Sequence, residues 1–250
     1  MAKLLPEHVE FIPTHPVFGP RTSSLNGQVV VLTPIKKGKW YPKVFNFLKT
    51  HNVRVIESSP KEHDDMMSIV QILTHFSYIS TAVAIEKLGV NISQTREFAS
   101  PIYNLMVDMI SRIVSQNPFL TYSIQNENEN GEKVREVFAE SVIELKDILS
   151  LQEKDEFVKI VSAATKNMDD IQAALERSDK AIESLTRELT LLKKFIGEKI
   201  AIEDIYSGKV YIGILKELNP DYLIIATEND LKELKIANIK ILDNKLSDNS

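Results

Sequence analysis

The pattern of hydrophobic and polar positions divides the 250-residue chain into three regions. In the first, Gln28–Leu32 and Val53–Ile56 are short runs rich in β-branched residues, which predict two buried strands. Apolar residues at helical spacing from Trp40 to Leu48 predict a short amphipathic helix between them. A sheet this small is marginal by itself, so we expect residues 1–58 to be the end of a larger α/β domain.

From Ser59 onward the apolar spacing becomes that of helices. Ser59 is a predicted N-cap, with Pro60 in the first turn. Apolar residues between Met66 and Ile79 occupy most of the helix circumference, so we expect this helix to be buried. Further helices are predicted at Ile102–Ser115 and Lys133–Leu151, with a polar loop at Gln125–Glu132.

A long segment without Gly or Pro follows, from Glu153 to Ile196. Its apolar residues recur at alternating spacings of four and three, which is close to a heptad pattern. The pattern predicts helices that pack in a bundle, either across a dimer interface or within one chain, with a break near Arg177–Asp179. We therefore assign residues 59–197 to a helical domain.

The last region has the pattern of strands. Short apolar runs separated by turn signals predict a small β-barrel at residues 198–245, similar in strand rhythm to Sm-like barrels. No helix-length segment interrupts them, which disfavours a βαββαβ ligand-sensing module. The predicted fold is thus mainly α, with a short α/β start and a small all-β end. The four predicted strands are Lys199–Ile205, Val210–Leu215, Tyr222–Ala226 and Leu234–Leu242.

Composition excludes several classes of protein. The chain is 43% hydrophobic and 26% charged, as in ordinary globular proteins. It has no Cys, which excludes disulfides, zinc–thiolate sites and a cysteine nucleophile. Its net charge of −5 gives no basic field for nucleic acid, which disfavours nucleic acid as a partner. Since no uninterrupted apolar run approaches about 20 residues, and the N-terminus lacks an apolar signal segment, we expect a cytoplasmic protein without membrane spans.

Two residues stand out as candidates for chemistry. His15 lies in the segment Thr14–Pro20, where two prolines and a glycine predict a stiff loop after a short apolar segment. A histidine held in this way can act in proton transfer, although a structural histidine in a turn would give the same pattern. Arg112 interrupts the apolar run Ile110–Val114; it either binds an anion or extends to solvent from a helix end.

We expect no metal site. His63 and His75 share a predicted helix, but they are twelve residues apart, which places them about 120° apart around an α-helix. The two acidic residues that follow His63 are a weak signal for a metal by themselves, and no HExxH spacing occurs.

Four segments together resemble the prephenate dehydrogenase family of tyrosine biosynthesis. They are HPVFGP (15–20), QVVVLTP (28–34), EHDDMMSIVQILTHF (62–76) and ASPIYNLMVDMISRIVSQNP (99–118). The resemblance covers Glu7–Leu120 by motif and the helical region to Ile196 by architecture, and the C-terminal β region lies outside it. It implies a Rossmann domain that binds NAD or NADP, and a helical domain that forms the homodimer and most of the substrate pocket. The implied reaction is the oxidative decarboxylation of prephenate to 4-hydroxyphenylpyruvate, or the equivalent reaction of arogenate.

The resemblance also implies roles for individual residues. His15 would bind the ring hydroxyl of the substrate and help to remove its proton. Arg112 would bind a substrate carboxylate. His75 would line the substrate pocket, although it could equally be a core histidine, and we expect His63 to be structural, in the first turn of its helix. Tyrosine is a plausible inhibitor by the same resemblance.

A dinucleotide site needs a Gly-rich turn, and the sequence contains no G-x-G. The chain therefore resembles the C-terminal portion of the enzyme without its dinucleotide domain, and we expect little or no turnover by this chain alone. Two alternatives remain: a non-catalytic sensor that binds prephenate or tyrosine, and a structural helical oligomer.

Overall fold

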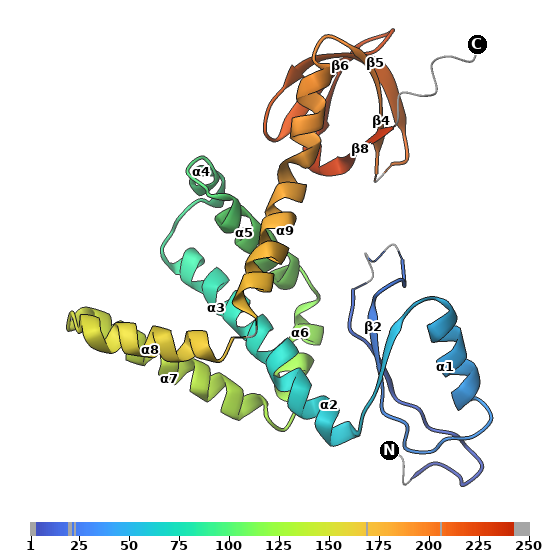
Figure 1. Cartoon of the computed structure of the whole chain (residues 1–250), viewed down its shortest axis with the longest axis vertical. Coiled ribbons are helices and arrows are strands. Elements are labelled where there is room, and N and C mark those ends of the chain that lie inside the picture. The colour runs from blue at the N-terminus through green and yellow to red at the C-terminus, as the bar shows by residue number, and fades with distance from the viewer. Residues whose placement is uncertain (1–3, 20–21, 23, 169, 206, 243–250) are drawn as a thin grey trace. The chain divides into compact units, whose positions relative to one another are not determined.

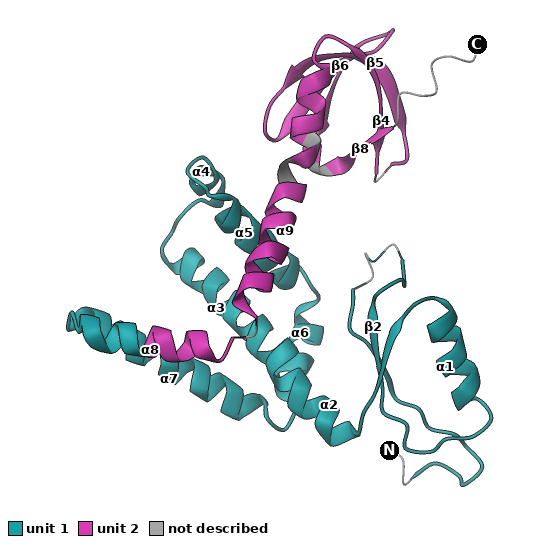
Figure 2. Cartoon of the chain, in the orientation of Figure 1, with its two compact units in different colours: residues 1–159 teal, residues 160–250 magenta. Residues whose placement is uncertain are grey.

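The computed structural model describes residues 4–19, 22, 24–168, 170–205 and 207–242. By its internal contacts the chain divides into two compact units, Met1–Lys159 and Ile160–Ser250 (Figure 2). The first unit contains a small α/β part followed by helices. The second contains a long helix and a β-sheet.

The α/β part is a three-stranded sheet with one helix. Its strands are β1 (Thr14–Pro16), β2 (Val29–Leu32) and β3 (Arg54–Glu57), in the order β1-β2-β3. β2 pairs with β3 in parallel, and helix α1 (Tyr41–Thr50) connects them and lies beside them in Figure 1. The predicted strand–helix–strand unit is present, with a core of Val30, Leu32 and Val53 under α1.

The helical part begins with one continuous helix (Figure 1). It consists of α2 (Pro60–Met67), a π-helical segment η2 (Ser68–Leu73) and α3 (Thr74–Lys87). Ser59 caps it as predicted, because its hydroxyl accepts the N–H of Glu62. The remaining helices of this part are α4 (Ile92–Arg96), α5 (Pro101–Val114), α6 (Pro118–Asn126) and α7 (Gly131–Ser150).

The structure corrects two predictions for this region. The loop predicted at Gln125–Glu132 is shorter, because α6 extends to Asn126 and α7 begins at Gly131. The continuous helix is also less buried than its apolar pattern predicted: Met67 and Ile72 are buried, but Met66, Ile69 and Val70 are at least half exposed.

The same helix, Pro60–Lys87, is the one helix among the described residues that is long and apolar enough to cross a membrane by length and composition. Its mean hydropathy reaches 1.4 over 18 residues. The helix contacts α5 through α3 and α7 through η2. Core helices of non-membrane proteins pass the same test, so this observation is weak evidence for a membrane span.

Two side chains stabilise the π-helical segment, one from another helix and one from the turn that follows it in the same helix. A π turn bonds residue i to i+5, so carbonyl groups lose their usual α-helical partners. The Gln125 amide donates to the Ile72 carbonyl at 3.2 Å, and the Thr74 hydroxyl donates to the Ile69 carbonyl at 3.3 Å. These bonds satisfy backbone groups at the irregular turn, which would otherwise be costly to bury.

The heptad-like segment forms two helices, α8 (Lys154–Lys166) and α9 (Ile171–Leu192). The break was predicted near Arg177–Asp179, but that stretch lies inside α9; α8 ends at Lys166 and α9 begins at Ile171. Asp170 sets the new helix start, because its carboxylate accepts the N–H of Ala173. A side chain that caps the helix therefore decides the position of the break, where the apolar pattern alone gave no signal.

The C-terminal sheet has five strands in the order β7-β6-β5-β4-β8. Its core contains Ile202, Leu215 and Leu223, and Leu192 from the end of α9 packs against them. The strands are β4 (Lys199–Asp204), β5 (Val210–Leu218), β6 (Tyr222–Ala226), β7 (Leu231–Lys235) and β8 (Ile239–Leu242).

Two predictions for this sheet were wrong. The sheet is open among the described residues, with β7 and β8 at its two edges, so it is not the closed Sm-like barrel that the strand rhythm suggested. The single strand predicted at Leu234–Leu242 is two strands, separated by the short 3-10 helix at Ile236–Asn238.

Candidate active site

His15 lies in a strand and not in the stiff loop that was predicted. β1 pairs antiparallel with β2, and His15 is opposite Val31 in the register. The start of this pairing is fixed by the N–H of Thr33, which donates to the Pro13 carbonyl at 3.0 Å. Because β2 is the central, buried strand, it gives His15 a rigid support.

Both ring nitrogens of His15 have partners on the continuous helix. Nδ1 of His15 lies 2.8 Å from Nε2 of His63, and Nε2 of His15 lies 3.2 Å from the amide nitrogen of Gln71. The two imidazole rings meet edge to face, with centroids 5.1 Å apart. His63 in turn places its Nδ1 2.8 Å from the carboxylate of Asp64. The arrangement is a chain of four side chains, from Gln71 through His15 and His63 to Asp64.

The first turn of α2 is held in place by several short-range bonds. Beyond the Ser59 cap, the Ser58 hydroxyl donates to the Glu62 carboxylate at 2.8 Å. From the loop between α6 and α7, the amide of Asn128 donates to the backbone carbonyl of Asp64, also at 2.8 Å. These bonds fix the position from which His63 reaches His15.

The surroundings of His15 favour its neutral form. Burial, and to a lesser extent the neighbouring His63, lower the pKa of His15 below its usual value. A neutral imidazole can accept a proton near neutral pH. Burial also lowers the pKa of His75, which lies further along the same helix.

A cleft of about 340 Å³ lies beside these groups, at the small end of the range for small-molecule sites. Its walls come from the strands β1 and β2, the residues that flank them, and the start of α2. His15, His63 and Asp64 are among the lining residues, together with Thr33 and Ile35. The cleft therefore offers a small ligand both apolar surface and proton-transfer groups.

Arg112, in the last turn of α5, reaches the segment that follows β1. Its Nη2 would lie 3.8 Å from a Cβ built on Gly19. Arg112 is exposed, so its charge does not carry the desolvation cost that a buried arginine in an apolar run would have. Its guanidinium makes no ion pair with any residue that the structure describes.

His75 stays apart from this group in the described contacts. Its Nδ1 is buried and has no hydrogen-bond partner among the described residues, which is an unfavourable state for an imidazole nitrogen. The structure thus brings together His15, His63, Asp64 and Gln71. The sequence analysis singled out only His15 as catalytic, and it gave His63 a structural role.

The missed residues differ in the signal they gave. A histidine followed directly by an aspartate in the first turn of a helix is a visible pattern, which we had weighed only as a metal signal. Gln71 gave none, because its position depends on the π-helical segment. In the part of the chain that the structure describes, no group of three or more His, Asp or Glu residues is placed to hold a metal ion.

Comparison with protein families matches nearly all of the first unit. Residues 1–57 match the family model described as prephenate dehydrogenase, nucleotide-binding domain. Residues 59–163 match the model described as prephenate dehydrogenase, dimerization domain. The remaining residues, which include the C-terminal sheet, lie outside both matches.

Individual relatives agree with these matches. A probable arogenate/prephenate dehydrogenase of Methanocaldococcus jannaschii is 40% identical over an alignment of 248 residues, and the alignment covers 96% of this chain and 56% of the relative. The T-protein of Enterobacter agglomerans is 32% identical over 117 residues, 47% of this chain and 31% of that protein. The crystal structure of Synechocystis arogenate dehydrogenase superposes with a TM-score of 0.46 and 17% identity, over 63% of this chain and 60% of that chain. The chain thus spans about half or less of the length of these curated relatives.

Proposed function

Because the chain belongs to the prephenate dehydrogenase family, we propose that it supplies the substrate-binding and dimerisation parts of a prephenate or arogenate dehydrogenase. The complete reaction would be the NAD- or NADP-dependent oxidative decarboxylation of prephenate to 4-hydroxyphenylpyruvate in tyrosine biosynthesis. A cytoplasmic location and inhibition by tyrosine are proposed with it, on the family resemblance.

The observation that carries this proposal is the environment of His15. Its imidazole is held on a strand beside a cleft, and the burial that lowers its pKa favours the neutral form that can accept a proton. In the proposed reaction the proton of the ring hydroxyl passes to this imidazole, while a hydride leaves the ring carbon that carries this hydroxyl. General-base catalysis by a positioned histidine contributes roughly 10²–10⁴-fold to a rate.

Arg112 is proposed as the residue that binds a substrate carboxylate. Its position beside Gly19 places a cation on the segment that follows the His15 strand. A guanidinium pairs with a carboxylate through two parallel hydrogen bonds, which fixes orientation as well as charge. We propose the role of His75 in the substrate pocket from the family resemblance, supported by its buried nitrogen without a described partner.

The match of residues 1–57 to a nucleotide-binding domain supports NAD or NADP as the hydride acceptor. The residues present do not fit the whole cofactor, however. Phosphate groups of dinucleotides are bound by a Gly-rich turn at a helix N-terminus, and these 250 residues contain no G-x-G. We therefore derive no step on the cofactor, and propose that turnover requires a dinucleotide domain in addition to these residues.

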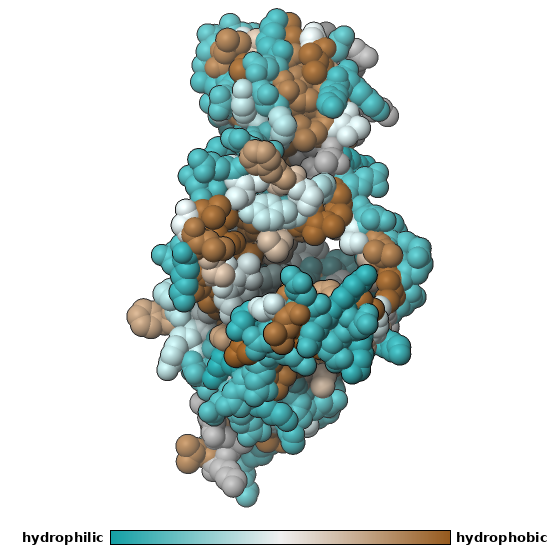
Figure 3. All heavy atoms as spheres, turned by 90° about the vertical axis from the view of Figure 1, so that its left-hand side faces the viewer, coloured by the Kyte–Doolittle hydropathy of each residue, from teal (hydrophilic) through white to brown (hydrophobic). Residues whose placement is uncertain are grey.

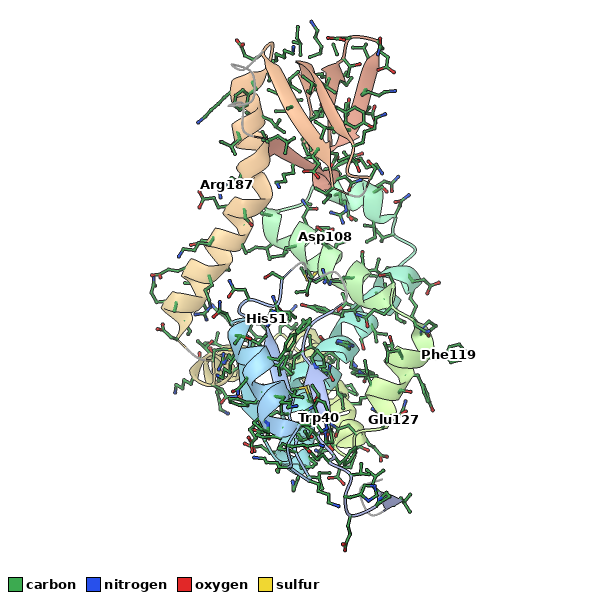
Figure 4. All side chains as sticks on the ribbon, turned by 90° about the vertical axis from the view of Figure 1, so that its right-hand side faces the viewer. Trp40, His51, Asp108, Phe119, Glu127 and Arg187 are labelled. Atoms are coloured by element: carbon green, nitrogen blue, oxygen red, sulfur yellow. The ribbon has the colours of Figure 1, made fainter. Side chains whose placement is uncertain are left out.

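Exposed apolar side chains support dimerisation through the helical part. Phe98 is 90% exposed and Phe119 is 82% exposed. Figure 4 shows Phe119 extending outward from α6, and Figure 3 shows hydrophobic side chains gathered at several places on the surface of the helices. Exposed patches of this kind mark interaction sites. We propose a homodimer, and sedimentation equilibrium should give twice the chain mass of 28.4 kDa.

The function is tested in two steps. Calorimetry first measures whether the chain binds prephenate or arogenate. The chain is then joined to the dinucleotide domain of a relative, and prephenate-dependent NADH or NADPH formation is followed with CO₂ release. We expect His15→Asn to lower kcat by roughly 10²–10⁴-fold. His51→Asn, at the end of α1, is the matched control and should leave kcat unchanged.

Three results would contradict the proposal. No substrate binding would exclude the family activity for this chain. Binding without turnover, in a joined protein that folds and binds NAD or NADP, would support the sensor alternative. An effect of His15→Asn on KM alone would exclude its role as the proton acceptor.

A further inference from the structure

We propose that His63 and Asp64 are positioning residues that hold His15 in the tautomer whose Nε2 carries no hydrogen and can accept a proton. The inference rests on the proposed function for its catalytic meaning, because it concerns the residue that would act as the base. Its structural content, which ring nitrogen of His15 carries the hydrogen, can be measured without any turnover.

The argument starts at Asp64, because a carboxylate can only accept hydrogen bonds. Its oxygen lies 2.8 Å from Nδ1 of His63, so this nitrogen must carry the hydrogen and donate. In a neutral imidazole the other nitrogen is then an acceptor. Asp64 therefore fixes Nε2 of His63 as the acceptor that faces His15.

The second link follows in the same way. Nε2 of His63 lies 2.8 Å from Nδ1 of His15, so Nδ1 of His15 must be the donor. This leaves Nε2 of His15 without a hydrogen. Independent support comes from the other side of the ring, where the amide nitrogen of Gln71 lies 3.2 Å from that same Nε2 and can donate to it. All three contacts agree on a single tautomer.

The series of side chains from His15 through His63 to Asp64 can also stabilise a positive charge on His15. When His15 accepts a proton at Nε2 it becomes a cation, and its Nδ1 hydrogen remains bonded to His63. The Asp64 carboxylate at the end of the chain then stabilises the positive charge through His63. The side chain of His63 is only 19% exposed, whereas that of Asp64 is 48% exposed. His63 is therefore shielded from competing water, and Asp64 can be replaced without disturbing a packed core.

The test measures the tautomer of His15 directly. Nitrogen-15 NMR of the histidine rings distinguishes hydrogen on Nδ1 from hydrogen on Nε2, and the His15 signal is assigned by its loss in His15→Gln. In the unaltered chain we expect hydrogen on Nδ1. In His63→Leu and in Asp64→Ala we expect a mixture of the two tautomers. His63→Gln should restore the Nδ1 form, because its amide oxygen can accept from Nδ1.

The matched control is Asp65→Ala. Asp65 follows Asp64 directly, but its carboxylate bonds to Lys61 at 2.8 Å and to the Asn130 amide at 3.0 Å, and to neither histidine. Its removal should leave the tautomer of His15 unchanged. A thermal melt checks that each variant is folded. If His63→Leu does not fold, Asp64→Ala alone decides the test, because that side chain is half exposed.

The catalytic arm uses the chain joined to a dinucleotide domain. Asp64→Ala should lower kcat with little change in KM, by no more than the roughly 10²–10⁴-fold that a general base contributes. Hydrogen on Nε2 in the unaltered chain, or an unchanged tautomer in folded Asp64→Ala, would overturn the inference. A chain that keeps the Nδ1 form but binds no prephenate would instead overturn the proposed function and leave the tautomer control standing.

Discussion

Replacement of Arg112 by alanine tests how the substrate carboxylate is recognised. Among the described residues the Arg112 guanidinium has no ion-pair partner, so its charge is available to a ligand. Arg96 provides the contrast, because it is already paired with Asp108 at 2.6 Å and with the Asn104 amide at 3.1 Å. Both arginines are exposed residues near helix ends of the same unit. They differ in whether the protein already uses their hydrogen-bond donors.

The structure sets the size of the expected effect. A hydrogen bond to a charged group contributes about 1.5–3 kcal/mol. The value for a fully buried pair does not apply, since Arg112 is exposed in the free chain. At about 1.4 kcal/mol per tenfold change in affinity, Arg112→Ala should weaken prephenate binding by roughly 10- to 150-fold. The prephenate affinity of Arg112→Lys should lie between those of the unaltered chain and Arg112→Ala, because an ammonium group is a point charge and not a planar fork.

Isothermal calorimetry with prephenate measures this effect on the 250-residue chain, without any cofactor. Arg96→Ala is the control, and its affinity should match that of the unaltered chain. The reasoning fails if folded Arg112→Ala binds prephenate as tightly as the unaltered chain. It also fails if Arg96→Ala weakens binding as much as Arg112→Ala does, because the effect would then be one of general charge and not of a specific contact.

Three further predictions concern the rest of the chain. Burial lowers the pKa values of His15 and His75 below 6.5, so between the lowered values and pH 6.5 the native state binds fewer protons than the unfolded state. The free energy of unfolding should therefore rise with pH across that window. Urea titrations at several pH values measure it, and a fall would contradict the prediction. Gly131→Ala should lower the free energy of unfolding by about 1–3 kcal/mol in the same urea titrations, because the new Cβ would lie 2.7 Å from the Gln125 carbonyl oxygen. This clash should outweigh the better helix propensity of alanine. An unchanged free energy of unfolding would show that the backbone moves easily to make room. A chain that ends at Lys166 should bind prephenate within about twofold of the full chain, and a larger loss by calorimetry would show that the second unit contributes to the site.

Local signals in the sequence predicted most of the elements. Ser59 and Pro60 mark a helix start through a cap and a fixed φ, and the structure has both. The first strands were predicted because β-branched residues concentrate in short runs there. The break between α8 and α9 was misplaced, since apolar spacing is continuous across it and Asp170 alone marks it.

The C-terminal sheet shows a different limit. The starts of its first three strands and the turns between them were predicted because they are local, although β5 continues to Leu218, past the predicted end at Leu215. Whether a sheet closes depends on which strands lie at its edges, and this is a property of long-range pairing. The edges here are β7 and β8. β8, the last strand of the sheet in sequence, pairs with β4, the first. Strand rhythm carries no information about that pairing.

The alignment of the candidate site residues on the continuous helix depends on one irregular segment, η2. In a regular α-helix His63 and His75 would lie about 120° apart, which led us to separate them. A π turn needs more residues, so each residue rotates by roughly 80° and not 100°. The six residues of η2 therefore reduce the angle between the two histidines to less than about 30°. The same correction brings Gln71 to the side of His63, which agrees with the contact of both with His15. Because Gln125 of α6 satisfies the Ile72 carbonyl, the alignment of the candidate site depends in part on a tertiary contact that no local pattern in residues 60–87 could have predicted.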